Sequence, residues 1–481
     1  MKTFNDFLEE IGEVGYADQV LQSIVYASGL PSLKPGELVV FESGELGRAV
    51  SISENQSEIL TLSHKEIKVG EKIARTNKFL EITVSDDLLG KIIDPLGTSL
   101  DGPLSDKGER RQIDITPPGM IDRDIIKDPL ETGVILVDLT IPLGKGQREL
   151  IIGDRKTGKT QFFERTMTNQ AKKGNICIYA AIGKKAVEIK HMKESIDKRG
   201  IGKNVVFVAS SASDSPGLVF TTPYTAMAIA EYFKDKGKDV VVFLDDLTNH
   251  AMYYRQIALL SRRFPGRSSY PGDIFYIHSK ILERAGKFKK GSITCFPVAE
   301  SIMGDFTGVI QTNLMSMTDG HIFFDLELAN LGRHPAINPF LSVTRSGQQA
   351  QTPLVRDLSR ELSSFLINLE RLRGFLHFGA EISNEIRQKL DLGDRILSVF
   401  DQPADTVPIN VSLLIIALLW IGFWKDGTQA KMREKVLMLI KDYEATESVR
   451  NNINSLIQKS NSFASLLDNL RAGDYGQKRY Y

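Results

Sequence analysis

The sequence of 481 residues predicts a multidomain protein with an N-terminal β-barrel, a central α/β domain and a C-terminal α-helical domain. Three observations favour this order: short valine- and isoleucine-rich runs come first, apolar runs alternating with helical stretches follow, and a leucine stripe at helical spacing comes last. The length also allows about three domains. These patterns place the domains at residues 1–76, 77–351 and 352–481.

The N-terminal zone has the pattern of a small barrel. Its apolar runs are separated by Ser-Gly and Glu-Asn turn signals, which is typical of a closed or sandwiched sheet of short strands. The clearest runs are GELVVF, GRAVSI and SEILTL, all between Val14 and Thr76. We expect this zone to carry no catalytic residue.

The central zone alternates apolar runs with stretches of helical periodicity. This alternation is typical of a parallel sheet covered by helices, because each parallel connection needs a crossover. The strand-like runs are LIIG, NICIYAAIG, NVVFVAS and DVVVFLDD. The two cysteines of the chain, Cys177 and Cys295, lie inside apolar runs, which favours buried free thiols in a reducing compartment over a disulfide or a metal site.

The C-terminal zone is predicted to be helical. Thr352 and Pro353 are the predicted N-cap and first helical residue. A stripe of leucines at helical spacing follows and predicts core packing: Leu354, Leu358, Leu362, Leu366 and Leu369. The apolar run at 411–424 is shorter than the ~20 residues of a membrane-spanning helix, so we expect a buried helix there.

Composition excludes some classes of partner. The chain carries 60 basic and 60 acidic residues, and this balance leaves no global field to attract nucleic acid or an anionic membrane. Its first residues, MKTFNDFLEEIGEV, lack the apolar centre of a signal peptide, so we expect no export by that route. Membrane contact, if it exists, should therefore come through a partner.

One motif carries clear chemistry. An apolar strand in QRELIIGDRKTGKT runs into the phosphate-loop pattern Gly-x4-Gly-Lys-Thr and a helix-compatible stretch follows. In such loops the glycines let backbone N–H groups face the phosphates, the lysine reaches the β and γ oxygens, and the threonine hydroxyl holds Mg²⁺. The central domain is therefore predicted to be a phosphate-loop (RecA-like) nucleotide-binding domain. Its phosphate-binding residues are Gly153, Asp154, Arg155, Lys156, Thr157, Gly158, Lys159, Thr160 and Gln161.

A second element supports the phosphate loop. The apolar run VVVFLDD ends in two adjacent carboxylates, Asp245 and Asp246. In phosphate-loop proteins a strand of this kind ends in an aspartate that holds the Mg²⁺ shell through water. Thr160 and Asp245 are the predicted magnesium residues.

Four long segments, in this order, carry a family resemblance. The segments are GQRELIIGDRKTGKT, YYRQIALLSRRFPGRSSYPGDIFYIHSKILERA, TDGHIFFDLEL and HPAINPFLSVTRSGQQAQ. They are similar to segments of the α (non-catalytic) subunit of F-type ATP synthases, and the likeness extends from about Val14 to at least Gln402. The resemblance implies ATP or ADP with Mg²⁺ as cofactors.

The resemblance also implies an assembly. It implies an alternating ring of three α and three catalytic β subunits around a central stalk, coupled to proton or sodium flow and held at the cytoplasmic side of a membrane through partner subunits. Family α subunits carry an N-terminal extension that docks a peripheral stalk, whereas MKTFNDFLEEIG is short here. We therefore expect weakened or different stator attachment, and a motor that only hydrolyses ATP is the alternative to a synthase.

Turnover by this chain is expected to be low. Catalytic β subunits carry a water-polarising glutamate after the strand that follows the phosphate loop, and α subunits usually carry glutamine there. The matching position is Lys184, which cannot accept a proton while charged. Glu188 could substitute only from about 6 Å further along a helix. Lys184 is also a departure from the α pattern, and it puts the hydrogen bonding near the γ-phosphate in doubt.

Arg345, in FLSVTRSGQQAQ, is the predicted catalytic contribution. It matches the arginine that α subunits insert across the interface into the neighbouring β site. A guanidinium supplied in trans stabilises charge that develops on the transferring phosphoryl group.

Residues near the adenine depart from the family pattern. Family α subunits place an Arg-Pro pair there, whereas this chain has His334-Pro335 preceded by Arg333. Gln402, in VFDQPAD, matches a region where family glutamines meet the adenine, although a solvated loop glutamine is an equal alternative. His334, Pro335 and Gln402 are thus candidate base contacts.

Two other classes of protein fit the sequence less well. A helicase-like or secretion ATPase of the same superfamily would need a glutamate at Lys184, and the basic run at 262–267 lies within the family match, where a role at a subunit interface is the better interpretation. A structural subunit without nucleotide would be expected to have a degraded phosphate loop, yet Lys159 and Thr160 are present.

Overall fold

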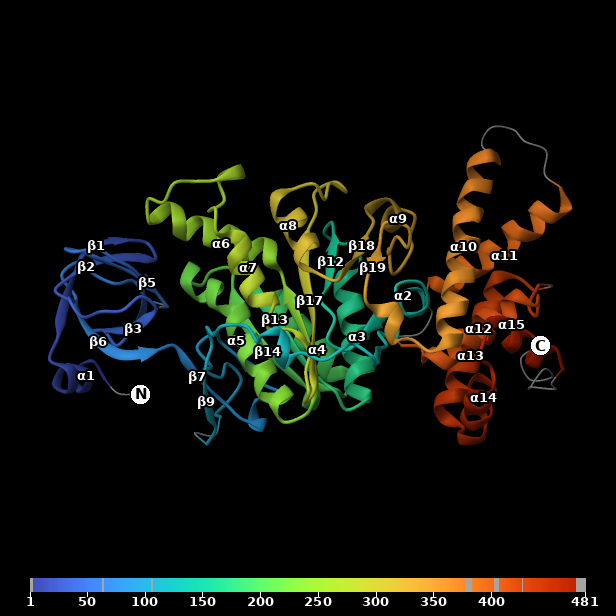
Figure 1. Cartoon of the computed structure of the whole chain (residues 1–481), viewed down its shortest axis with the longest axis horizontal. Coiled ribbons are helices and arrows are strands. Elements are labelled where there is room, and N and C mark those ends of the chain that lie inside the picture. The colour runs from blue at the N-terminus through green and yellow to red at the C-terminus, as the bar shows by residue number, and fades with distance from the viewer. Residues whose placement is uncertain are drawn as a thin grey trace. The chain divides into compact units, whose positions relative to one another are not determined.

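In the computed structural model the chain forms two compact units. Figure 1 shows the helices and strands of the whole chain, coloured from blue at the N-terminus to red at the C-terminus. The first unit consists of Met1–Asp124, Gly174–Glu300 and Phe306–Thr318, and the second of Ile125–Lys173, Ser301–Asp305 and Asp319–Tyr481. The described residues are 3–62, 65–104, 107–376, 383–401, 406–425 and 427–472.

The first unit opens with a closed six-stranded barrel in the order β1-β2-β5-β4-β3-β6. Every strand pair in it is antiparallel. The three predicted runs fall in β3, β4 and β5, so the N-terminal barrel is confirmed. The strands are β1 Val14–Leu21, β2 Ile24–Ser28, β3 Glu37–Phe41, β4 Leu46–Ile52, β5 Ser57–Thr61 and β6 Lys72–Phe79.

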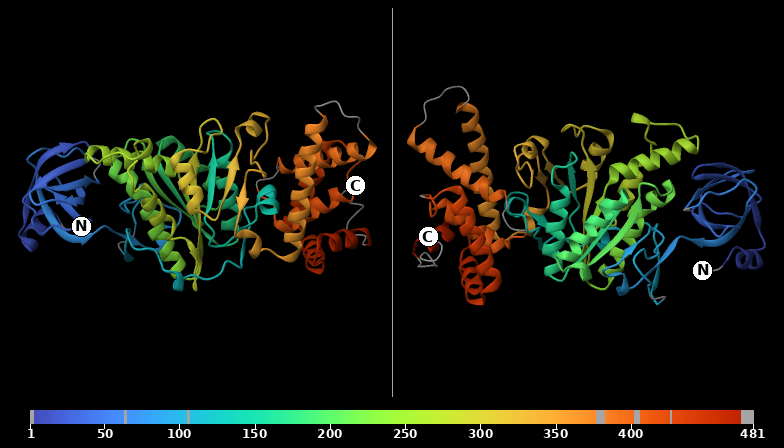
Figure 2. Two further views of the ribbon diagram at one scale, coloured as in Figure 1. Left: turned by 45° about the horizontal axis from the view of Figure 1, so that its top comes forward. Right: turned by 180° about the vertical axis from the view of Figure 1, so that it is seen from behind.

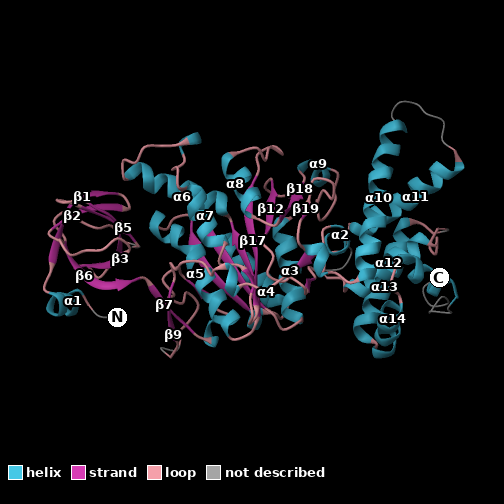
Figure 3. Cartoon of the chain, viewed as in Figure 1, coloured by secondary structure: helices cyan, strands magenta, loops and turns pink. Residues whose placement is uncertain are grey.

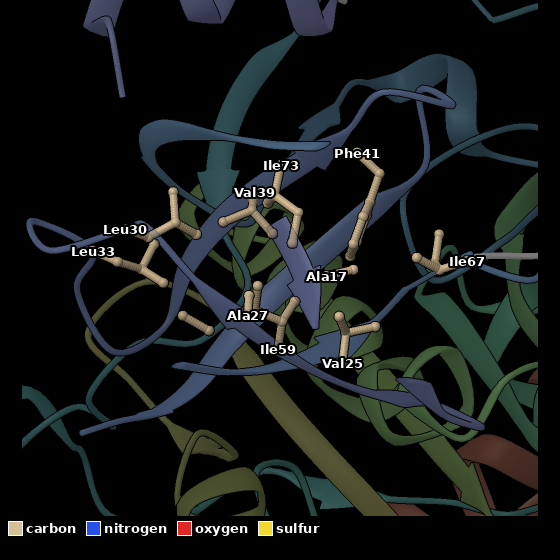
Figure 4. Packing of buried hydrophobic residues seen from close by; sticks show 11 residues of the cluster. Ala17, Val25, Ala27, Leu30, Leu33, Val39, Phe41, Ile59, Ile67 and Ile73 are labelled. Atoms are coloured by element: carbon tan, nitrogen blue, oxygen red, sulfur yellow. The ribbon is translucent and has the colours of Figure 1, made fainter. Parts of the chain in front are cut away.

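Alternating side chains of these strands fill the barrel with an apolar core. The period of two along a strand sends every second side chain inward, where burial away from water stabilises the closed sheet. Phe41 and Ile59 are fully buried there. Figure 4 shows the labelled members of this cluster: Ala17, Val25, Ala27, Leu30, Leu33, Val39, Phe41, Ile59, Ile67 and Ile73.

A short helix, α1 (Phe4–Ile11), precedes the barrel. Thr3 caps it, because its hydroxyl accepts from the Asp6 backbone N–H while the Asp6 carboxylate accepts from the Thr3 N–H. Phe4 and Phe7 are buried in a cluster with barrel residues of β3 and β6.

The rest of the first unit is built on parallel strands. β17, β15, β13, β14 and β8 pair in that order, each parallel to its neighbour, and α4, α5 and α6 pack against them. β16 pairs antiparallel with β17, because a four-residue connection is too short for a parallel crossover. The elements are β7 Glu81–Val84, β8 Ile92–Ile93, β9 Glu109–Gln112, β13 Ile176–Lys184, α4 Ala186–Lys198, β14 Val205–Ser211, α5 Pro216–Asp235, β15 Asp239–Asp245, α6 Leu247–Leu260, α7 Ile274–Leu282, β16 Gly286–Lys287, β17 Ser292–Glu300 and α8 Val309–Met317.

The second unit contains the strand and helix that flank the phosphate loop, β12 and α3. β12 pairs parallel with β18, and β18 pairs antiparallel with β19. The predicted parallel sheet is therefore correct for the central strands, and antiparallel strands make it mixed. The elements are β10 Pro129–Leu130, α2 Ile135–Thr140, β11 Leu143–Gly144, β12 Glu149–Gly153, α3 Lys159–Lys172, β18 Gly320–Phe324, α9 Leu326–Asn330 and β19 Val343–Thr344.

From α10 onward the described chain is helical, as Figure 2 and Figure 3 show. All five leucines of the predicted stripe lie on α10 and are buried. The apolar run at 411–424 contributes α12, whose residues 411–419 are buried, and no described helix is long and apolar enough to cross a membrane. The helices are α10 Pro353–Leu376, α11 Asn384–Phe400, α12 Ile409–Trp420, α13 Gln429–Ala445, α14 Glu447–Lys459 and α15 Phe463–Ala472.

The predicted fold class is confirmed: an N-terminal barrel, a central α/β nucleotide-binding domain and C-terminal helices. The two compact units cut through the central region, so the predicted boundaries after residues 76 and 351 stay predictions. Cys177 on β13 and Cys295 on β17 are buried free thiols, as expected.

Candidate nucleotide site

The phosphate loop joins β12 to α3 in the second unit, and both glycines have structural reasons. A Cβ on Gly153 would lie 2.4 Å from the carbonyl oxygen of Phe324 on the neighbouring strand, so only glycine fits. Gly158 has φ of 98° at the N-cap of α3, a conformation that favours glycine. A glycine N-cap supplies no side-chain acceptor, which leaves the positive end of the helix dipole to an anion.

The loop is braced from inside by Asp154 and Thr157, both buried. The Thr157 hydroxyl donates to the Asp154 carbonyl at 2.8 Å. The Asp154 carboxylate accepts from the Ser301 hydroxyl at 2.8 Å and from the Gly304 N–H at 2.9 Å. These bonds fix the loop backbone, and a fixed backbone is what oriented N–H donors to phosphate require.

The predicted binding groups of the loop differ in their exposure. Lys159 is half-buried, and its ammonium donates to the carbonyl oxygens of Gly153 at 2.7 Å and Asp154 at 2.5 Å, which holds it against the loop. The other four predicted contacts, Arg155, Lys156, Thr160 and Gln161, are exposed. The surface therefore offers a lysine, a helix N-terminus and the Thr160 hydroxyl, a donor set that suits a phosphate chain and Mg²⁺.

The ends of β13 and β15 form a charged cluster in the first unit. The Lys184 ammonium lies 2.8 Å from Asp245 Oδ1 and 3.2 Å from Asp246 Oδ2. The Tyr179 hydroxyl donates to Asp245 Oδ2 at 2.6 Å, and the Asn249 N–H donates to Asp246 Oδ1 at 2.6 Å. Asp246 thereby caps α6.

This environment keeps Lys184 charged. Burial of the ammonium opposes its charge, but the carboxylates of Asp245 and then Asp246 outweigh burial and raise the pKa of Lys184 above its ordinary value. Burial, and next the Asp245 charge, also raises the pKa of Tyr179 well above its ordinary range. Glu188 lies exposed in the first turn of α4.

Arg345 directly follows the edge strand β19 and is exposed. Its backbone N–H donates to the Asp319 carbonyl at 2.9 Å, and Arg148 in turn forms an ion pair with the Asp319 carboxylate at 3.0 Å. Glu149 is fully buried nearby, and this burial raises the pKa of its carboxyl well above the ordinary value. Arg345 is thus an exposed residue with an anchored backbone.

The predicted base contacts lie partly outside the described residues. His334 is exposed and Pro335 is buried. The Asp401 carboxylate accepts from the His334 backbone and forms an ion pair with Arg433 at 3.3 Å, which brings the segment after α11 against the His-Pro pair. Gln402, the next residue, lies outside the described part of the chain.

The structure groups the predicted residues by unit. The phosphate loop, His334-Pro335 and Arg345 belong to the second unit, and Asp245 and Lys184 belong to the first. Sequence reasoning missed the supporting partners Tyr179, Ser301 and Gly304. A serine directly after the apolar run of β17 was the one signal that could have pointed to Ser301.

Comparison with known proteins first gives the class. Residues 133–344 match the family model described as "ATP synthase alpha/beta family, nucleotide-binding domain". The match includes the phosphate loop, Lys184 and Asp245.

Curated relatives then give the subunit type. The "ATP synthase subunit alpha" of Clostridium botulinum strain Hall is 39% identical over 427 residues, which cover 86% of this chain and 84% of the relative. The proteins of the same name from strains Kyoto and Langeland have the same identity and coverage. The chain therefore belongs to the family of ATP synthase alpha subunits.

Proposed function

We propose that this chain binds ATP or ADP on its phosphate loop, turns it over little or not at all, and completes the catalytic site of a neighbouring beta subunit with Arg345. One observation carries the proposal: the residue at the position of the water-activating group is Lys184, a charged ammonium paired with two carboxylates. An ammonium in this state cannot take a proton from water.

Nucleotide binding is supported by the loop itself. Lys159 and the N-terminus of α3 would hold the phosphates, Arg155, Lys156 and Gln161 would border them, and Thr160 would ligate Mg²⁺. Bound Mg²⁺ would neutralise charge on the phosphate oxygens. His334, Pro335 and Gln402 are the proposed contacts on the adenine side.

Magnesium fits the two predicted residues unequally. The Thr160 hydroxyl is exposed on the first turn of α3 and suits a direct ligand. Asp245 is the proposed ligand through water, but both of its carboxylate oxygens already accept from protein donors. A water of the Mg²⁺ shell would have to compete with these donors.

Arg345 is the proposed trans-acting residue. Its exposed position after an edge strand suits insertion into a neighbouring subunit, and a fixed guanidinium stabilises charge on a transferring phosphoryl group without accepting or donating protons in the reaction. In this role the residue acts only in the assembled complex.

The proposed assembly follows from family membership. It is an alternating ring of alpha-type and beta-type subunits around a central stalk, coupled to transport of protons or sodium in a membrane sector. Attachment to a peripheral stalk is proposed to be weak or different, and a motor that only hydrolyses ATP is the alternative. The chain would be peripheral, at the cytoplasmic side of the membrane, and held there by partner subunits.

Binding of a fluorescent ATP analogue to the full chain tests nucleotide binding. Lys159→Ala is expected to weaken binding about 10- to 100-fold, because a charged hydrogen bond to phosphate is lost. Lys190→Ala, which removes an exposed lysine of α4, is the matched control and should bind as the wild type does. Equal binding by all three proteins would contradict the proposal.

A further inference from the structure

The end of β15 has no free carboxylate oxygen. All four oxygens of Asp245 and Asp246 accept from protein donors: Lys184 bonds one oxygen of each, Tyr179 bonds the second oxygen of Asp245, and the Asn249 N–H bonds the second oxygen of Asp246. The distances lie between 2.6 and 3.2 Å. The pair is thus satisfied by the chain alone.

The cluster is also largely withdrawn from water. The side chains of Lys184, Asp245 and Asp246 are 17%, 10% and 1% exposed. A lone buried carboxylate pair would repel itself and would favour a cation from solution. Here the chain supplies that cation, because the Lys184 ammonium bridges both carboxylates.

We infer that Lys184 is a built-in substitute for the divalent cation at this end of the sheet, so that Mg²⁺ adds little to the affinity of this chain for nucleotide. The inference rests on the proposed nucleotide binding and concerns one feature of it, the dependence on metal. Removing the Lys184 charge is expected to restore that dependence, because Asp245 then regains an oxygen that can order the water shell of Mg²⁺.

Three proteins test the inference: the full-length wild type, Lys184→Gln and Lys184→Arg. The affinity for a fluorescent ADP analogue is measured with Mg²⁺ and with EDTA. For the wild type we expect the two affinities to agree within about threefold, and for Lys184→Gln we expect Mg²⁺ to increase affinity by about tenfold or more, since one charged hydrogen bond contributes about that much. Lys184→Arg keeps a cation at the carboxylates and should behave as the wild type does.

The wild-type measurement alone can overturn the inference, even where a variant does not fold. Tenfold stronger binding by the wild type with Mg²⁺ would contradict it and would leave the proposed function standing. An unchanged metal dependence in a folded Lys184→Gln would show that Lys184 is only a structural ion-pair partner. Loss of nucleotide binding in every condition would contradict both proposals. Lys190→Gln is the matched control, because it removes the charge of an exposed lysine on α4. It should not change the dependence of nucleotide affinity on Mg²⁺.

Discussion

His250 on α6 and His278 on α7 form a fully buried pair of imidazoles. His250 Nδ1 lies 3.2 Å from His278 Nε2, and His250 Nε2 lies 3.0 Å from the Phe220 carbonyl oxygen. Burial lowers the pKa of His250 from 6.5 to about 4 and the pKa of His278 well below its ordinary value. Both rings are therefore neutral in the folded chain at neutral pH.

This pair predicts a loss of stability in mild acid. Because the pKa of His250 is lower in the folded chain than in the unfolded chain, the unfolded chain binds a proton at a higher pH. The contribution of neutral His250 to the free energy of unfolding is therefore complete above pH 6.5 and is lost as the pH falls toward about 4. The free energy of unfolding is expected to fall by about 3 kcal/mol from His250 alone. Denaturant unfolding at a series of pH values measures it.

His250→Gln should flatten this pH dependence, since glutamine carries no titratable group and can still donate to the Phe220 carbonyl. His191→Gln, which changes an exposed histidine of α4, is the control and should keep the wild-type profile. A His250→Gln profile as steep as that of the wild type would assign the acid sensitivity to other groups.

Single residues of the site differ in how far sequence could predict them. The phosphate loop could be predicted because its residues have a fixed spacing. Lys184 could be matched to the position of the family glutamate, because it follows the first strand after the phosphate loop. The partners Tyr179 and Ser301 could not be predicted, because their contacts with Asp245 and Asp154 join residues 66 and 147 positions apart through the tertiary fold. Asn249 is a local partner, since it lies three residues after Asp246 at the N-cap of α6. The sequence therefore predicted Lys184 but not that its ammonium bridges Asp245 and Asp246.

At the scale of elements, α1 shows how packing outweighs propensity. A helix of eight residues is marginal in water, and the sequence alone predicts only a few turns. The Thr3–Asp6 capping box stabilises its start, and Phe4 and Phe7 bury against Val40 and Ala74 of the barrel. The helix exists because the barrel gives its apolar face a partner.

Phe7→Ala tests this packing. It should lower the free energy of unfolding by about 3 kcal/mol, because a buried ring is removed and a cavity remains. Phe264→Ala removes a ring that is 96% exposed and should change stability by less than about 0.5 kcal/mol. The midpoint of denaturant unfolding is the measurement, and equal midpoints for the two variants would show that α1 does not stabilise the barrel.

Longer elements were predictable because their patterns are strong. The leucine stripe of α10 and the apolar runs of β13, β14 and β15 each extend over several residues. The structure forms a helix at the stripe and strands at the runs, as predicted. The antiparallel strands β16 and β19 were not predicted, since strands of two residues carry no periodic signal. Their antiparallel pairing makes the sheet mixed, which the sequence did not predict.

At the scale of the whole molecule, family membership means that this chain is one subunit of a larger complex. With Lys184 at the position that matches the water-activating glutamate, we expect the chain to turn over little of its own nucleotide, and we propose that the exposed Arg345 acts beside a partner. The central claim is therefore that the chain contributes to catalysis in trans.

Steady-state ATP hydrolysis by the chain alone and assembled with its beta partner tests this claim most directly. The chain alone should be silent, and in the assembled complex Arg345→Ala should lower turnover by about 10³- to 10⁵-fold. Arg360→Ala, which removes a largely exposed arginine of α10, is the control and should leave turnover unchanged. Hydrolysis by the chain alone that Lys159→Ala abolishes, with Arg345→Ala having no effect in the complex, would identify a catalytic subunit and contradict the account.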